Sequence, residues 1–405
     1  MVKKLWNKNF VLLLQSSAVS MIGDIMYSVA IGYWVYQQTG SNSLMGIMSS
    51  ISMFVTMFLS PFSGTIVDKL NRKFILVLGD FCQGVIMITV GILAFTGNLS
   101  VPIVLIAAFL AAFGGVFYSP ASSTVLIDVV PHDDLVRGQS LFSGVSSTVN
   151  MVGNAFSGAM VAFLGVPLII IINGCSNIYS AISEMLIHVP KTSREGEPVT
   201  VKGVLNDSKT AVKIIFQNPC LKIFIPGAIL LNFLAAGPFT LMLPFTIEKG
   251  FELSQYGILM SMSTVGSLIC VVLLGTIKFK PRARYWILAI GFTVSVVCWI
   301  IAYQSTDFVS VCIWMLLGSF LNCAGNTVFG ASMMLALPEG NRGAILGFFS
   351  AATTGGIALS SLAYGFLGDI FPLYIIFTVG SLFSLVPMIY ICFNKNIKNF
   401  ILESK

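Results

Sequence analysis

Long apolar runs follow one another along almost the whole chain, and they limit its possible folds more than any other feature. A helix needs about 20 apolar residues to cross the hydrocarbon core of a bilayer. Twelve runs reach that length, and they cover residues 10–36, 44–66, 74–95, 101–127, 139–164, 167–188, 222–247, 254–276, 285–304, 308–334, 343–367 and 372–393. Hydrophobic residues make up 56% and charged residues only 9%, whereas soluble domains are about a quarter charged. The sequence therefore predicts an all-α membrane protein with twelve transmembrane helices.

The positions of Lys and Arg predict how these helices are oriented. If the N-terminus lies in the cytoplasm, all 22 Lys and Arg residues except Lys249 fall on the cytoplasmic side. Positive charge is enriched in cytoplasmic loops, so both termini are expected to be cytoplasmic. The first apolar run is of spanning length and no small-residue cleavage site ends it, so we expect the first helix to be retained.

A polar segment at residues 190–221 divides the chain into two halves of six helices, 1–189 and 222–405. The halves share short motifs: Gly64-Thr-Ile in the first recurs as Gly275-Thr-Ile in the second. Parallel six-helix repeats are typical of secondary transporters that rock around a central site. The segment 190–221 is expected to be a cytoplasmic linker.

Several other classes of function find no support in the sequence. The net charge of +6 is spread over loops and is not interleaved with aromatic residues, which argues against a nucleic-acid partner. The eight cysteines show no CxxC spacing and the two histidines form no cluster, so no metal is expected. A phosphate-binding Gly-rich loop and a nucleophile elbow are missing. We therefore expect neither an enzyme nor a cofactor.

Two sets of residues carry a family resemblance. The stretch Gly64-x-x-x-Asp68-Lys69-x-x-Arg72-Lys73 resembles the loop motif between helices 2 and 3 of the major facilitator superfamily. Within that superfamily, further stretches are similar to bacterial macrolide-efflux drug exporters. They are Gly23-Asp24-x-Met-Tyr27, Tyr36-Gln-Gln-Thr-Gly-Ser41, Leu78-Gly-Asp80 and Phe117-Tyr-Ser-Pro120.

The resemblance implies two pseudo-symmetric six-helix bundles around a cavity lined by helices 1, 4, 7 and 10. It also implies a monomeric, multi-pass protein of the bacterial inner (plasma) membrane. Two departures stand out. The helix 4 arginine common in proton-coupled antiporters would fall near Ala111 and is absent, and Phe279 occupies the position in the second half that is equivalent to Asp68.

Asp24 is the acidic residue that lies deepest in an apolar run. A charged carboxylate at that depth costs about 3 kcal/mol on insertion scales, so it is expected to face protein or a wet cavity. No Lys or Arg lies deep in any run. Asp24 is therefore a candidate proton-coupling residue or an attractor for a cationic substrate. The alternative is an aspartate that only forms hydrogen bonds to Asn or Ser on another helix.

The charged turn around Asp68 is a candidate cytoplasmic gate, a role that rests largely on the resemblance. We expect Gly64, Asp68, Arg72, Lys73 and Asp80 to contribute, with Asp68 beside the N-terminus of helix 11. Asp80 is expected to pair with Arg72 or Lys73. In the alternative interpretation, the cations only set the topology.

Polar stripes and aromatic residues predict where a substrate binds. Helices 5, 7 and 10 carry Asn and Ser at helical spacing, and such stripes face other helices or a cavity. A large hydrophobic ligand suits an apolar wall with a few polar groups. The candidate substrate-binding residues are Tyr27, Trp34, Phe113, Asn150, Asn232, Phe233, Phe239, Asn322 and Asn326.

Together these features predict a secondary transporter that exports hydrophobic drugs or macrolide-like antibiotics by alternating access and proton antiport. One alternative is an exporter of a physiological metabolite such as a siderophore, lipid or peptide. Another is a uniporter or a membrane sensor that does not transport. The expected partners are a small hydrophobic substrate, protons and the lipid bilayer.

Overall fold

The chain is almost entirely helical in the part that its computed structural model describes, which is residues 4–188, 209–210, 212–276, 281–336, 342–394 and 398. No β-strand occurs in these ranges. Eleven stretches within them are long and apolar enough to cross a membrane. The helix at Leu135–Leu164 is not among the eleven, although it spans 30 residues; together with it they make up the twelve expected helices. The prediction of an all-α membrane protein is confirmed.

The chain folds into two compact units. Unit 1 comprises Met1–Gly40 and Ile51–Thr200, and unit 2 comprises Ser41–Ser50 and Val201–Lys405. Much of the linker expected at 190–221 lies outside the described residues.

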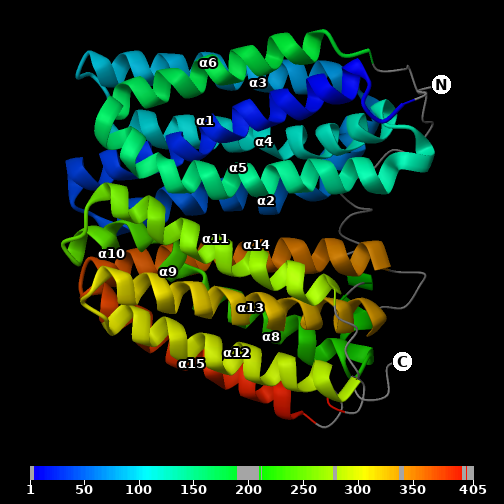
Figure 1. Cartoon of the computed structure of the whole chain (residues 1–405), viewed down its shortest axis with the longest axis vertical. Coiled ribbons are helices and arrows are strands. Elements are labelled where there is room, and N and C mark those ends of the chain that lie inside the picture. Colours follow the sequence, from blue (N-terminus) through cyan, green and yellow to red (C-terminus); the bar gives the residue numbers. More distant parts are fainter. Residues whose placement is uncertain are drawn as a thin grey trace. The chain divides into compact units, whose positions relative to one another are not determined.

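The helices of the first half run side by side (Figure 1). They are α1 (Lys8–Thr39), α2 (Asn42–Lys69), α3 (Arg72–Phe95), α4 (Val101–Val129), the short 3₁₀ helix η1 (His132–Asp134), α5 (Leu135–Leu164) and α6 (Val166–Met185).

Within unit 1, α6 packs against both α1 and α3. Glycines allow this close approach. A Cβ atom at Gly84 of α3 would lie only 2.9 Å from the carbonyl oxygen of Gly174 in α6. A Cβ atom at Gly23 of α1 would lie 3.2 Å from the Asn173 Cα atom of α6. Such near contact of backbones is characteristic of helix packing in membranes, and it brings the polar faces of the three helices together.

The helices in the described part of the second half also appear in Figure 1. They are α8 (Leu221–Ala235), α9 (Gly237–Thr240), α10 (Met242–Glu248), α11 (Leu253–Thr276), α12 (Pro281–Gln304), α13 (Phe308–Ala336), α14 (Arg342–Gly368) and α15 (Leu373–Phe393). In unit 2, α13 packs against α11 and α12, while α8 packs against α14 and α15.

The span expected at 222–247 is interrupted at Ala236 and Leu241, which divides it into α8, α9 and α10. Pro238, at the start of α9, has no N–H to donate within a continuous helix. Backbone polar groups freed inside a membrane need partners, and α14 supplies them. The Gly237 N–H donates to the Ser360 hydroxyl at 2.8 Å, and the Tyr364 hydroxyl donates to the Leu234 carbonyl at 2.6 Å. The broken helix is thus held by side chains of its neighbour.

The N-terminus of α2 is capped within unit 2. Asp369, which follows α14, accepts hydrogen bonds from the backbone N–H groups of Asn42 (2.6 Å) and Ser43 (3.2 Å). Ser41 also donates its hydroxyl to this carboxylate at 3.0 Å. A carboxylate there satisfies amides that have no partner within the helix and complements the helix dipole.

Candidate functional site

A cavity of about 470 Å³ lies inside unit 2. Its walls come from α8, α9, α12, α13, α14 and α15. The wall is largely apolar and aromatic, and a small number of Asn, Thr and Ser side chains interrupt it. The polar residues are Asn232, Asn322, Asn326, Thr353 and Ser384, and the aromatic residues are Phe239, Phe292, Trp299, Phe329 and Phe349. This size and composition are those of a site for a small organic ligand.

Four of the predicted substrate-binding residues line this cavity: Asn232, Phe239, Asn322 and Asn326. The Asn326 amide donates to the Asn322 side-chain oxygen at 2.7 Å, which fixes the two groups relative to each other. The Phe239 ring meets Trp299 edge-on, with ring centroids 5.5 Å apart. The cavity wall therefore contains both an aromatic pair and a pair of hydrogen-bonded amides.

The other predicted substrate-binding residues do not line this cavity. Phe113 is 47% exposed and borders a separate apolar groove formed by α2, α3 and α4. The Asn150 amide donates to the Ser146 carbonyl of its own helix at 2.9 Å. Tyr27 lies near Asp24 and interacts electrostatically with its carboxyl group. Trp34 and Phe233 are half-buried.

Asp24 lies in a polar pocket of unit 1 between α1, α3 and α6. The Gln83 amide donates to its Oδ1 atom at 3.0 Å, and the side-chain amides of Asn173 and Asn177 lie beside the same carboxyl group. Asn177 also donates to the Asn173 side-chain oxygen at 3.0 Å. Among the described residues, Asp24 forms no ion pair. The surroundings are neutral amides, which suit either a proton-binding carboxyl or a purely structural hydrogen-bond acceptor.

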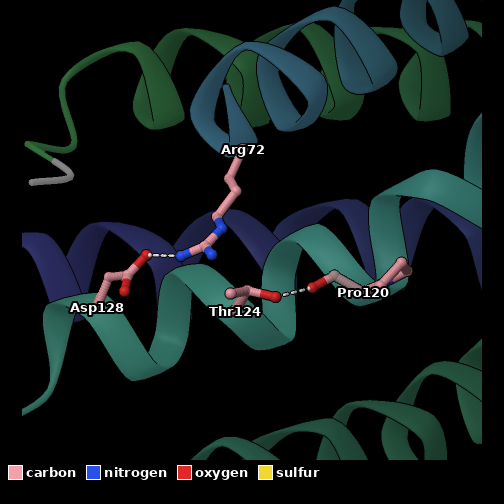
Figure 2. A network of polar contacts seen from close by, with 4 residues as sticks. All are labelled: Arg72, Pro120, Thr124 and Asp128. Carbon is pink, nitrogen blue, oxygen red and sulfur yellow. Dashed lines mark hydrogen bonds and ion pairs between the residues drawn. The ribbon is translucent and has the colours of Figure 1, made fainter. Parts of the chain in front are cut away.

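The pairing expected for Asp80 is not found among the described contacts. Arg72 forms an ion pair with Asp128 of α4 at 2.6 Å (Figure 2), and Lys73 donates to the Met185 carbonyl at the end of α6, also at 2.6 Å. Asp80 follows Arg72 by eight residues, about 12 Å along the helix axis. Its carboxyl group is buried within the bundle and faces Ser180.

The remaining gate residues stay a prediction. Gly64 lies in α2 with open space beside it, while the side chain of Asp68 is outside the described residues. Figure 2 shows the Arg72–Asp128 ion pair and, one turn earlier on α4, the Thr124 hydroxyl donating to the Pro120 carbonyl at 2.6 Å.

The sequence-based prediction missed a polar stripe on α6. Asn173, Asn177, Ser180 and Glu184 follow at intervals of four, three and four residues, and each side chain is buried. The spacing that identifies one face of a helix was present in the sequence. Tyr118 of α4 donates its hydroxyl to Glu184 Oε1 at 3.0 Å.

Comparisons with known proteins agree with this architecture. A sequence profile described as Major Facilitator Superfamily matches residues 13–302. The chain is 22% identical over 313 residues to the uncharacterized MFS-type transporter YkuC of Bacillus subtilis, covering 74% of this chain and 71% of that protein. It is 24% identical over 186 residues to macrolide efflux protein A of Streptococcus pyogenes, covering 46% of each. Among solved structures, the nucleoside transporter NupG has a similar fold, with a TM-score of 0.75, 13% identity and coverage of 98% of this chain and 99% of that one.

Proposed function

Because the chain belongs to the Major Facilitator Superfamily, we propose that it exports hydrophobic small molecules, such as macrolide-like antibiotics or other drugs, by alternating access and proton antiport. The observation that carries the proposal is the cavity in unit 2, with its aromatic wall and few amides. An apolar wall takes up the bulk of a hydrophobic ligand, and the amides orient it. The similarity to macrolide efflux protein A over about half of each chain favours this class of substrate.

Asp24 is the residue to which we assign proton coupling. It lies within α1, a membrane-spanning helix, and its neighbours are neutral amides. Ionisable groups at such depth commonly serve ion pathways. When Asp24 loses its proton, hydrogen bonds from neutral side chains are what stabilise the negative charge. The proton affinity of Asp24 therefore depends on how polar its pocket is.

The protein is a multi-pass membrane protein, and we place it in the bacterial inner membrane with both termini in the cytoplasm. The distribution of Lys and Arg supports this orientation. Export then means movement of the substrate away from the side that holds the termini. The protein is expected to work as a monomer.

Equilibrium binding of radiolabelled erythromycin and of a lipophilic cation tests the ligand class. Asn322→Ala removes an amide from the cavity wall, and we expect the dissociation constant to rise about 5- to 10-fold, which corresponds to the loss of one hydrogen bond. Asn98→Ala provides a matched control, because Asn98 is in the exposed turn between α3 and α4. Equal affinity in the two variants would contradict the assignment of this cavity.

The same assay separates the metabolite alternative. Tight binding of a siderophore or peptide, without binding of either drug, would indicate that the protein exports a physiological substrate and not drugs.

A further inference from the structure

The buried polar stripe of α6 extends well beyond Asp24. From Asn173 to Glu184 it covers 12 residues, which is about 16 Å along the helix axis at 1.5 Å per residue step. The exposed fraction of the side chains at positions 173, 177, 180 and 184 is 1% or less. Ionisable groups buried in a transmembrane helix are costly and generally serve a function.

Three carboxyl groups lie at successive levels along this stripe. Asp24 lies at the level of Asn173 and Asn177. Asp80 of α3 faces Ser180 and interacts electrostatically with Asp24. Glu184 accepts a hydrogen bond from the Tyr118 hydroxyl of α4 and interacts electrostatically with Asp80. Asp80 is therefore an electrostatic neighbour of both other carboxyl groups.

Asp80 and Glu184 each have an oxygen atom without a hydrogen-bond partner among the described residues. These atoms are Asp80 Oδ2 and Glu184 Oε2, and the exposed fractions of the two residues are 5% and 0%. The buried cation of the same region, Arg72, bonds to Asp128. A bare carboxylate oxygen in such surroundings is strongly disfavoured, whereas a neutral carboxyl group is tolerated.

The arrangement is extended rather than convergent. In the described part of the chain, His, Cys, Asp and Glu side chains do not gather in groups of three that could hold a metal ion. Carboxyl groups that follow one another along one face of α6, with the hydroxyl groups of Ser180 and Tyr118 beside them, suit a ligand that moves from one to the next.

We propose that Asp80 and Glu184 are two further proton-binding groups, which with Asp24 form a chain that carries protons through unit 1. In each step the O–H bond of one carboxyl group breaks, the proton passes through a hydroxyl group or a water molecule, and a new O–H bond forms on the neighbouring carboxylate. One negative charge moves the opposite way, so charge is conserved.

Glu184 is the second-last residue of α6, at the end where Lys73 contacts the helix. Among the three carboxyl groups it is therefore the one nearest the helix end that is expected to face the cytoplasm. This proposal of a row of proton-binding carboxyl groups rests on the proposed coupling role of Asp24. It adds a route by which the proton reaches and leaves that residue.

Infrared spectroscopy of the full chain in lipid tests proton occupancy without any substrate, because protonated carboxyl groups absorb apart from carboxylates. At neutral pH we expect protonated-carboxyl bands that shift in heavy water, and we expect Asp80→Asn and Glu184→Gln each to remove one of them. Glu252→Gln, at an exposed carboxylate, is the matched control and leaves the bands unchanged. Absence of the bands in the wild type would overturn the proposal. Their loss on addition of Ca²⁺ or Na⁺ would also overturn it and would identify a cation site instead.

Proton flux in proteoliposomes tests movement along the chain. We expect Asp80→Asn and Glu184→Gln to slow substrate-driven proton flux about tenfold or more, while the affinity for substrate stays that of the wild type. Normal flux in both variants would overturn the chain. If the wild type moves substrate without protons, the proposed antiport is refuted. If its infrared bands of protonated carboxyl groups are nevertheless present, Asp80 and Glu184 still bind protons, and only the antiport has failed.

Discussion

Replacing Gly84 by alanine is predicted to push α3 and α6 apart and to weaken unit 1. A Cβ atom at Gly84 would lie 2.9 Å from the Gly174 carbonyl oxygen and 2.7 Å from the Cδ1 atom of Ile178. The Ile178 side chain can change rotamer, but the Gly174 carbonyl is fixed by its own helix. The two backbones therefore have to separate, and with them the polar groups of Gln83 and Asn173 next to the glycines.

The expected loss follows from two opposing effects. Overpacking of this kind costs about 1–3 kcal/mol, and the higher helix propensity of alanine returns at most about 1 kcal/mol. The net destabilisation should be about 1–2 kcal/mol. Gly174→Ala creates a clash between the same two helices from the other side, since its Cβ atom would lie 2.9 Å from the Gly84 carbonyl oxygen and 2.8 Å from the Ile88 backbone nitrogen. Because the two changes share one contact, their effects should not add.

Gly114→Ala in α4 provides the matched control, because no atom lies within 4 Å of its added Cβ atom. This variant should keep its stability or gain up to about 1 kcal/mol from helix propensity. The assay is reversible unfolding in mixed micelles, with the free energy of unfolding compared among the three single variants. A Gly84→Ala protein as stable as Gly114→Ala would refute the close helix contact.

Two further predictions concern carboxylates near helix ends. Asp128→Asn removes a charged partner of the buried Arg72 guanidinium, and we expect the free energy of unfolding to fall by about 2 kcal/mol; an unchanged free energy of unfolding would contradict the contact in Figure 2. At Asp369, burial alone would raise the pKa, but hydrogen bonds from the segment Ser41–Ser43 hold the pKa below its usual value. Its stabilising effect is then complete above the unfolded carboxyl pKa of about 3.9 and disappears as pH falls through the lower folded-state pKa. Because the group is exposed, we expect less than about 1 kcal/mol. The protection factor of the Asn42 amide, which is its exchange rate relative to the intrinsic rate at each pH, should fall over that acidic range, and Asp369→Asn should abolish this fall; the same protection profile in both proteins would exclude the cap.

Hydrophobic length was sufficient to predict most of the helices. The last expected span, 372–393, differs from α15 by one residue at its start. The break at Ala236 was not placed within the span at 222–247, because the flanking sequence stays apolar and the broken backbone is stabilised by Ser360 and Tyr364 from far along the chain. The local sequence around residues 222–247 cannot indicate partners that lie so far away along the chain.

The spacing of residues along the sequence could not predict which helices contact one another. Asn232 and Asn322 were chosen from separate stripes, and only the packing of α8 with α13 and their neighbours brings both to one cavity. Arg72 was expected to bond to a nearby acid but meets Asp128, which is 56 residues away. The choice depends on how each helix is rotated about its axis, and packing decides that rotation.

The central claim, that Asp24 couples substrate export to proton movement, is tested most directly by proton flux on addition of substrate to proteoliposomes. We predict that the wild type moves protons against the direction of substrate. Asp24→Asn should fold, insert and bind substrate but carry no proton flux and show no gradient-driven transport. Proton-coupled transport at the wild-type rate in the Asp24→Asn protein would contradict the account.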